Sequence, residues 1–564
     1  MHSIKSGNAQ FNVVPDILVI VKNFYMATPS PDKSNKATKI KEITPAGESA
    51  DKWWQNNKYI TWLGYCLLLV PVVIYFSLVN KYAVNLPYLD DYNAILEFLS
   101  KFKTADFTDK IALLFSQHSD HRIFHARIIY VLYYYIFGKI NFIHLIFIGN
   151  LQLVVIYFLF IHFIKKVVPK YWSIVSLFAG ICLFDLSSYE NADYAMCGIT
   201  NYGVLMLFMV SLYYYNKTGH KYLILAGLFE AICIFSSGSG LICALCLVVF
   251  TLLSREKLKS ITSASIFITG IPLYYFHYQK MTEMGNITDA FTSTRDVSFF
   301  FHMLGNHFSF EYGVFIGVCE LVFLLVLLPT NLKSIRKFKF KPETLPLISI
   351  LCLLIGTSLS IAVFRSNDER LGEIASYASR YLIYTHMLAA VLFLLLWIKI
   401  DGKNKSLYVT TLAAGSLILF AYANNSEFGK NMLVKAQRRL EFYPYYYKDR
   451  TRQDMDEAME IATEACRQGI YCIDEERRNI HIDDIDSMAI QINTSEPRSA
   501  VVDLPASPNK YLLTVFNADG RKLVEKTSDG QEYDIHVVFK ISPGNYVLKV
   551  QNNNRNWQKA FTVK

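Results

Sequence analysis

Long apolar runs separated by short Lys-rich loops are the feature that most constrains this chain. A helix needs about 20 mostly apolar residues to cross the hydrocarbon core of a bilayer. The chain is 52% hydrophobic and 18% charged, whereas a soluble protein carries about 25% charged residues. We therefore predict an α-helical polytopic membrane protein with about eleven spans, at residues 59–79, 141–164, 171–187, 201–216, 221–237, 239–254, 261–278, 311–330, 345–364, 382–400 and 406–424.

The distribution of Lys and Arg predicts the orientation. With eleven spans, sixteen Lys and Arg residues fall in the loops on one side, at 165–170, 217–221, 255–259, 333–341 and 399–405. The short loops 188–200 and 237–238, on the other side, hold none. Basic loops stay in the cytoplasm, so we predict a cytoplasmic N-terminal segment (1–58) and a polytopic membrane domain (59–424). The net charge of +9 then reports orientation, and nucleic acid is not an expected partner.

If the aromatic run 124–137 were a span, every later loop would move to the opposite side of the membrane, and the basic loops would no longer be cytoplasmic. We therefore expect residues 122–138 to form a helix at the outer membrane surface, within a large first periplasmic loop (80–140). Its tyrosines at 130, 133, 134 and 135 suit an interfacial position.

The C-terminal region changes character twice. Apolar residues recur at helical spacing around Met459, and Gly469 is a helix stop, so 425–492 is expected to be a periplasmic helical segment. Alternating segments such as 511–516, 533–539, 546–550 and 560–563, separated by Asn-, Asp- and Gly-rich turns, predict an immunoglobulin-like β-sandwich over 493–564. Cys466 and Cys472 could form a disulfide in this compartment, and the sequence leaves their pairing open.

Charged residues in the outer loops are the candidates for chemistry. Asp90 and Asp91 are adjacent at the start of the first loop, where they are either a simple helix start or a general base. His121 and Arg122, in Gln117-His-Ser-Asp-His-Arg122, suit a phosphate or a lipid headgroup.

Two further groups lie at the outer ends of predicted spans. The acidic residues Asp185, Glu190 and Asp193 follow the third span, near membrane depth, where ionisable groups are costly. The loop with Arg365, Asp368 and Glu369 leads to Arg380, and its arginines call for anionic partners. Acidic groups for a base beside basic groups for a phosphate leaving group suit transfer from a lipid-phosphate donor.

The layout of residues 59–400 resembles the GT-C superfamily of polyprenyl-phosphate-sugar-dependent glycosyltransferases, and is similar in plan to protein O-mannosyltransferases and lipid A aminoarabinose transferases. The matching residues are Asp90-Asp91, His121-Arg122, Phe137-Gly138 and the span ending in Lys165-Lys166. The resemblance implies an inverting glycosyltransferase that moves a sugar from a lipid-linked donor to a glycan, lipid or protein acceptor at the outer face of a bacterial inner membrane.

By this resemblance Asp90 is the general base, although Asp91 stands where the family more often has Glu, which leaves the choice between the two open. Basic residues would hold the donor phosphate, with His121, Arg122, Arg365 and Arg380 as candidates. A divalent metal is compatible, and no cofactor is specified. We expect Asp90→Asn to lose activity, Asp91→Asn to lose less, and both variants to fold normally.

The segment from Leu512 through Asn517–Lys522 to Pro543–Val550 resembles the sorting domain of type IX secretion substrates. A tether of eleven spans does not suit export, so we interpret it either as an accessory module for glycan or partner binding or as a structural cap. A lipid-linked glycan transporter or flippase, or a non-catalytic scaffold, are the alternatives. Glu230 stands alone as an acid within its predicted span (221–237), whereas transport favours paired carboxylates within the membrane.

Overall fold

The computed structural model describes residues 58–169, 172–279, 294–306, 312–327, 342–366, 378–399, 415, 452–472, 491–494, 499–504, 511–528, 535–552 and 555–563. The chain divides into two compact units, Met1–Thr61 and Trp62–Lys564. Apart from the first turn of α3, every described element lies in the second unit.

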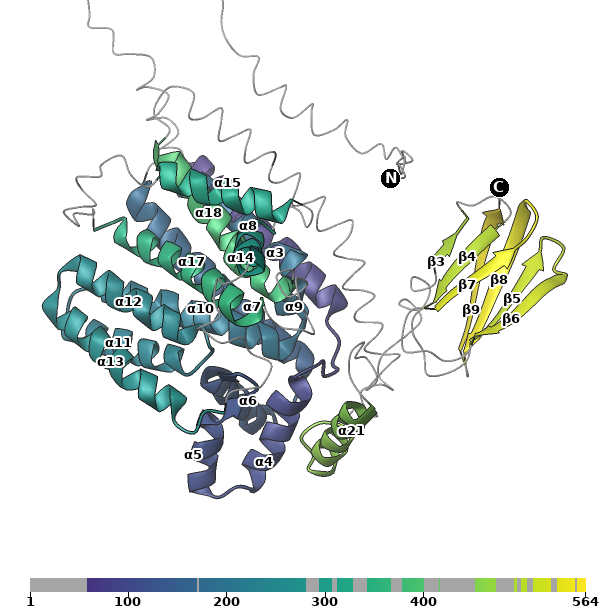
Figure 1. Ribbon diagram of the computed structural model, residues 1–564, viewed down its shortest axis with the longest axis horizontal. Coiled ribbons are helices and arrows are strands. Elements are labelled where there is room, and N and C mark those ends of the chain that lie inside the picture. The colour runs from purple at the N-terminus through teal and green to yellow at the C-terminus, as the bar shows by residue number, and fades with distance from the viewer. Residues whose placement is uncertain are drawn as a thin grey trace, which may run out of the picture. The chain divides into compact units, whose positions relative to one another are not determined.

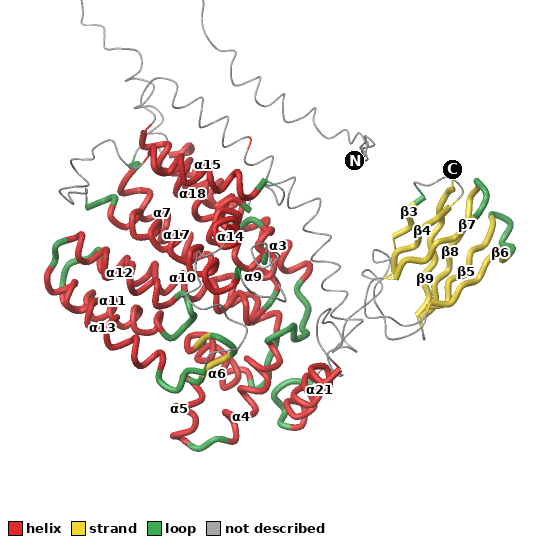
Figure 2. The backbone as a smooth tube through the Cα atoms, in the orientation of Figure 1, coloured by secondary structure: helices red, strands yellow, loops and turns green. Residues whose placement is uncertain are grey.

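Most described elements are helices (Figures 1 and 2). The α-helices are α3 Lys58–Tyr82, α4 Phe98–Thr104, α5 Phe107–Phe115, α6 Phe124–Phe137, α7 Phe142–Val167, α8 Trp172–Leu183, α9 Tyr189–Asp193, α10 Ala195–Tyr215, α11 His220–Ile234, α12 Gly240–Ser254, α13 Lys257–Tyr275, α14 Thr294–Gly305, α15 Gly313–Leu327, α17 Leu345–Arg365, α18 Leu382–Lys399 and α21 Arg452–Arg467. A π-helix, η1 (Tyr92–Glu97), and two 3-10 turns, η2 (Leu186–Ser188) and η5 (Ser379–Tyr381), complete the set.

Six stretches of the described chain are long and apolar enough to cross a membrane: Gly64–Tyr82, Phe142–Val167, Trp172–Asp193, Ala195–Tyr215, Leu345–Arg365 and Ser379–Ile398. Each coincides with a span expected from the sequence. Four other expected spans are helical as α11, α12, α13 and α15, of which Gly240–Ser254 and Gly313–Val326 are shorter apolar helices. The run 406–424 lies outside the described residues, apart from Gly415 in a helix. The count of eleven stays a prediction.

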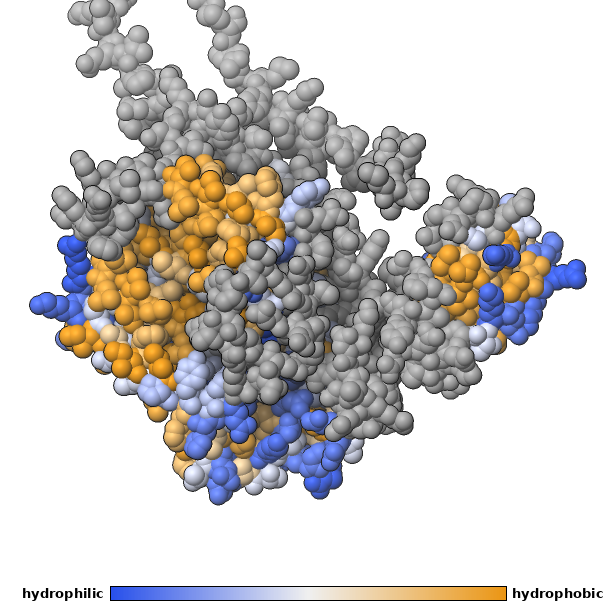
Figure 3. Space-filling model, in the orientation of Figure 1, coloured by the Kyte–Doolittle hydropathy of each residue, from blue (hydrophilic) through white to orange (hydrophobic). Residues whose placement is uncertain are grey.

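Apolar side chains cover the outside of the helical bundle. Val73 on α3 is 60% exposed and Phe158 on α7 is 55% exposed, and Figure 3 shows a hydrophobic band along the helices with a hydrophilic region at the end formed by α4 and α5. Exposed apolar area on this scale is costly in water and normal in contact with lipid.

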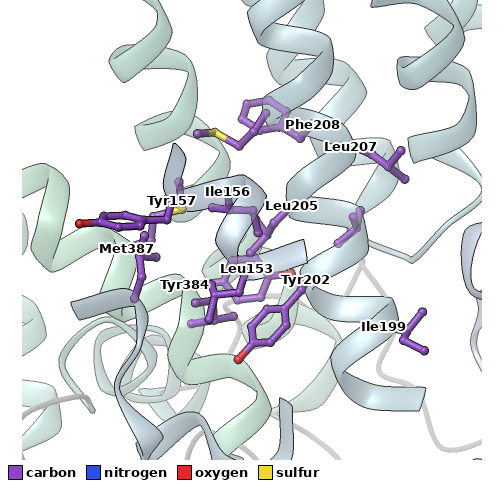
Figure 4. Packing of buried hydrophobic residues seen from close by; sticks show 14 of the residues in the cluster. Leu153, Ile156, Tyr157, Ile199, Tyr202, Leu205, Leu207, Phe208, Tyr384 and Met387 are labelled. Atoms are coloured by element: carbon purple, nitrogen blue, oxygen red, sulfur yellow. The ribbon is translucent and has the colours of Figure 1, made fainter. Parts of the chain in front are cut away.

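The bundle core lies between α7, α10 and α18. Figure 4 shows Leu153 and Tyr157 of α7, Tyr202 and Phe208 of α10 and Tyr384 of α18 packed together, all essentially buried. The backbones of α7 and α10 approach closely, because a Cβ added at residue 149 would lie 3.1 Å from the carbonyl carbon of Gly198.

The first outer loop contains the expected helix as α6. Its 14 residues are too few to cross a bilayer, and Gly138 ends it at φ +75°, a conformation that favours glycine. The interfacial assignment needs correction for two tyrosines. Tyr130 and Tyr133 are buried in the protein, since they lie on the face packed inward, whereas Tyr135 is 63% exposed. α14 was not expected, because the sequence predicts a loop over 279–310.

The described part of the helical tail is α21. Gly469, at φ +70°, follows its last residue as the sequence predicts, and Cys466 and Cys472 form a disulfide around this turn. The turn contacts the first outer loop: Ile140 N–H donates to the Ile470 carbonyl at 2.8 Å, and Tyr471 Oη donates to the Asn85 carbonyl at 2.7 Å.

The C-terminal residues form two antiparallel sheets. The strands are β3 Gln491–Asn493, β4 Ser499–Leu504, β5 Tyr511–Asn517, β6 Lys522–Ser528, β7 Ile535–Lys540, β8 Gly544–Asn552 and β9 Arg555–Val563. Their orders are β3-β4-β7 and β6-β5-β8-β9, and side chains such as Val502, Phe539, Leu513 and Leu548 from both sheets share one core. An antiparallel sandwich is therefore observed. β3, β4 and β6 were not predicted, because their sequences carry weaker alternation.

Candidate functional site

Loops far apart in the sequence meet at one end of the bundle. A two-stranded hairpin is at the centre of this end, with β1 (Gln117–His118) paired to β2 (His121–Arg122) and Ser119 between them at φ +47° (Figure 2). The segment after it contacts the end of α11, since Phe124 N–H donates to the Phe235 carbonyl at 2.9 Å. The outer loops of the predicted topology therefore share one end.

Arg122 fixes the hairpin to the end of α13. Its Nε donates to the Tyr274 carbonyl at 2.7 Å, and its two terminal nitrogens donate to the carbonyls of Phe276 and Phe115. The side chain is 6% exposed. With all three nitrogens on backbone oxygens, Arg122 has a structural role in this conformation, although the sequence placed it among the phosphate ligands.

Asp91 is also buried and structural in its contacts. It is 1% exposed. One carboxylate oxygen accepts the Tyr88 N–H and the other accepts the Met196 N–H, both at 2.9 Å. The carboxylate thus joins the first outer loop to the start of α10. The expectation that Asp91→Asn folds normally needs revision, because the substitution would place an amide opposite one of these N–H donors.

Asp90 has different surroundings. Its side chain is partly exposed, and its backbone N–H donates to Tyr194 Oη at 2.8 Å. The preceding residue, Leu89, has φ +49°, a conformation that costs energy for a branched side chain. The π-helix η1 begins at Tyr92, two residues after Asp90. Strained residues and π-helical turns are both frequent at functional sites.

His118 lies within electrostatic reach of Asp90. Burial lowers the pKa of His118, and the negative charge of Asp90 acts against that shift. His118 Nε2 is buried and has no hydrogen-bond partner among the described residues. The end of the bundle therefore brings a carboxylate and a neutral imidazole together.

Two of the predicted phosphate ligands lie beside the hairpin. The Arg365 guanidinium pairs with Asp120 at 2.8 Å, and burial lowers the pKa of His121 to about 4. Asp120 is 6% exposed, and its second oxygen has no hydrogen-bond partner among the described residues. Here the anionic partner that the sequence required for Arg365 is a carboxylate of the protein.

Arg380, in η5, pairs with Glu190 of α9. Their nearest atoms are 3.7 Å apart, and Arg380 is 31% exposed at its side chain. Glu190 also accepts the Ser379 hydroxyl at 2.9 Å and the Arg380 N–H at 3.1 Å. Glu190 therefore accepts two hydrogen bonds at the start of η5, and the Arg380 guanidinium also lies over the Tyr381 ring, 5.3 Å from its centre.

Asp185 and Asp193 are the other predicted acids that the structure describes. Asp185 accepts the Ser187 N–H at 2.7 Å and caps η2, while Asp193 is fully buried. Asp368 and Glu369 lie outside the described residues. Glu230, in α11, accepts hydrogen bonds from Tyr215 at 2.5 Å and Ser263 at 2.8 Å, so both its oxygens are engaged within the bundle.

Sequence reasoning missed Tyr194, His118 and Asp120. Tyr194 is 2% exposed and stacks edge-on to Tyr88 with ring centroids 5.3 Å apart. His118 and Asp120 belong to the motif 117–122, but the sequence analysis selected only His121 and Arg122 from it. Only the fold shows that His118 lies near Asp90 and Asp120 near Arg365. Within the described part of the chain, no three His, Cys, Asp or Glu side chains are placed to hold a metal ion.

No family model, curated protein sequence or solved structure matches this chain.

Proposed function

We propose that this protein is a membrane glycosyltransferase that moves a sugar from a polyprenyl-phosphate donor to a hydroxyl acceptor at the outer face of a bacterial inner membrane. The observation that carries the proposal is the contrast between the neighbours Asp90 and Asp91. Asp91 is buried with both oxygens on backbone N–H groups, whereas Asp90 is partly exposed on a strained turn.

Asp90 is the proposed general base. A sugar hydroxyl is a poor nucleophile at neutral pH, and a positioned carboxylate accepts its proton as the new bond forms. The acceptor oxygen bonds to the anomeric carbon, the bond from that carbon to the donor phosphate breaks, and the polyprenyl phosphate leaves with the electron pair. The Tyr194 hydroxyl, at 2.8 Å from the Asp90 N–H, holds the backbone of the base in place.

Arg380 is the proposed donor-phosphate ligand. A guanidinium binds phosphate through paired N–H donors, and this one is partly exposed and 3.7 Å from its carboxylate partner. Arg365 and His121 act from the other side of the site in this proposal, where Arg365 exchanges its contact with Asp120 for the phosphate. Arg122 is not included, since its nitrogens are engaged by carbonyls.

The membrane setting of the site is part of the same proposal. Six helices of spanning length, together with the sixteen basic residues in loops that the eleven-span topology places on one side, support a periplasmic site that a lipid-linked donor reaches from the bilayer. The other five spans of the eleven-span topology, and the classification of the β-sandwich as immunoglobulin-like, are also part of this proposal.

The first test replaces the base. Asp90→Asn should lower sugar transfer in proteoliposomes by about 10²–10⁴-fold, the usual contribution of a general base, with an unchanged thermal unfolding midpoint. The measurement is transfer from defined polyprenyl-phosphate sugars to a mixed acceptor pool, with the unfolding of each purified variant followed in detergent.

Asp91→Asn is the matched control. It should lower the free energy of unfolding by about 1–3 kcal/mol, because a buried N–H loses its acceptor, and its loss of activity should follow its loss of folded protein. Full transfer activity in the Asp90→Asn, Asp91→Asn double variant would end the glycosyltransferase proposal.

A further inference from the structure

A groove separates α21 from the helices that follow the acidic pair. It has a volume of about 480 Å³ and is lined by Glu97 of η1, residues 100, 101 and 104 of α4 and residues 457, 460, 461, 464 and 468 of the α21 segment. The two walls are joined at one end by the disulfide-closed turn, where Lys103 Nζ donates to the Gln468 carbonyl at 2.7 Å. Its size is typical of a small-molecule site.

The groove carries an excess of negative charge. Four carboxylates line it, at Glu97, Glu457, Glu460 and Glu464, against the single ammonium of Lys101. Lys101 pairs with Glu97 at 2.5 Å, and Glu464 pairs with Arg467 outside the groove at 2.7 Å. Glu457 and Glu460 form no ion pair with another described side chain, so these two carboxylates set the potential of the groove.

Two buried polar atoms at the same groove provide an independent observation. Ser100 is 7% exposed, and its hydroxyl has no hydrogen-bond partner among the described residues. The side-chain carbonyl oxygen of Gln468, on the opposite wall, is also buried and has no hydrogen-bond partner among the described residues. Buried polar groups are normally hydrogen-bonded. The Gln468 amide oxygen therefore indicates a ligand that donates hydrogen bonds, and the Ser100 hydroxyl on the opposite wall can accept one.

We propose that this groove binds a small organic ammonium compound with two or more amino groups, such as a linear polyamine. The carboxylates are spread along the groove, which fits charges separated by a short carbon chain better than one compact ion. Ammonium groups only donate hydrogen bonds, which the carboxylates and the Gln468 carbonyl require and which the Ser100 oxygen can accept. The proposal does not depend on the glycosyltransferase function.

The test is calorimetric titration of spermidine into the full chain in detergent at low ionic strength. The wild-type protein should bind one equivalent saturably. Glu457→Gln with Glu460→Gln should weaken binding about tenfold or more, because two charged hydrogen bonds are lost, and Ser100→Ala should weaken it severalfold. All three changes leave helix-forming backbone intact.

Asp109→Asn with Asp519→Asn is the matched control, since it removes the same charge at exposed sites outside the groove, and it should bind like the wild type. Three outcomes would overturn the proposal. The wild type fails to bind spermidine, the control loses as much affinity as the groove variant, or a tri-lysine peptide binds while spermidine does not, which would make the groove a peptide site.

Discussion

Adjacent residues with the same chemistry differ in exposure and contacts at the end of the bundle that carries the candidate site. Asp90 and Asp91 differ in exposure and in partners, because successive residues at the start of a helix point in different directions. His118 and His121 of the hairpin are similar to each other in one respect: burial lowers the pKa of both. His121 is therefore neutral at physiological pH, and a neutral imidazole can still donate a hydrogen bond to a phosphate oxygen.

The pKa of His121 predicts how stability depends on pH. In the folded protein His121 stays neutral down to about pH 4, whereas in the unfolded chain it takes up a proton near pH 6.5. The unfolded state therefore binds more protons between these values, and stability is lost as pH falls through this window. For this one group the loss is about 1.4 kcal/mol at pH 5.5.

The measurement is the thermal unfolding midpoint in detergent between pH 7.5 and 5.0. His121→Gln should reduce the fall in midpoint over this range, and His220→Gln, at an exposed position, should leave it unchanged. An identical pH dependence in the His121→Gln variant and the wild type would contradict the assignment.

At the scale of elements, close helix packing depends on glycines that a periodicity argument does not detect. α14 and α15 cross with their backbones in contact, and the glycines at 305, 313 and 317 lie at the crossing. A Cβ added at residue 317 would overlap the Phe301 carbonyl oxygen, and one at residue 313 would lie 2.6 Å from His302 Nε2. Small residues allow this approach in membrane helices.

Gly317→Ala should therefore destabilise the bundle. Because the added methyl meets backbone rather than a flexible side chain, we expect a cost of about 1–3 kcal/mol, seen as a lower unfolding midpoint in detergent. Gly64→Ala is the control, since the added atom would lie 3.6 Å from the Ser173 Cβ, an ordinary contact. Equal midpoints for the two variants would mean that the α14–α15 crossing is looser than described.

At the scale of the whole molecule, basic residues near helix ends make aromatic contacts of the kind found at membrane interfaces. Lys165 Nζ lies 3.7 Å from the centre of the Trp172 ring, and Lys217 Nζ lies 4.7 Å from that of Tyr213. Both belong to the loops that the sequence predicts to be cytoplasmic. The opposite loops, from 83–97 to 378–381, carry the candidate site.

This arrangement predicts the accessibility of two introduced thiols. Ser528→Cys, in β6, should react with a membrane-impermeant maleimide in intact spheroplasts, whereas Ser334→Cys, in a predicted cytoplasmic loop outside the described residues, should react only after permeabilisation. Both variants should be made in a background without the free cysteines at 66, 319 and 352, which are exposed. Labelling of Ser334→Cys alone in intact spheroplasts would invert the topology.

The sequence by itself determined the helical membrane class, the positions of most helices, the α6 segment with its glycine stop and the alternating strands of the sandwich. These features depend on the spacing of apolar residues within one segment, and such a pattern is local. It also predicted that four charged residues lie at the same end of the helical bundle, namely Asp90, Glu190, Arg365 and Arg380.

Only the tertiary structure decided what each of these residues contacts. Asp91 reaches Met196 N–H, Arg122 reaches carbonyls of residues 274 and 276, Arg365 reaches Asp120, and the turn at 470–471 reaches the first outer loop. Each of these pairs is more than 100 residues apart in the chain, so no local pattern encodes it. Burial and partner choice are set by which segments the packed helices bring together, and this is why one aspartate of an adjacent pair became structural while the other stayed available for chemistry.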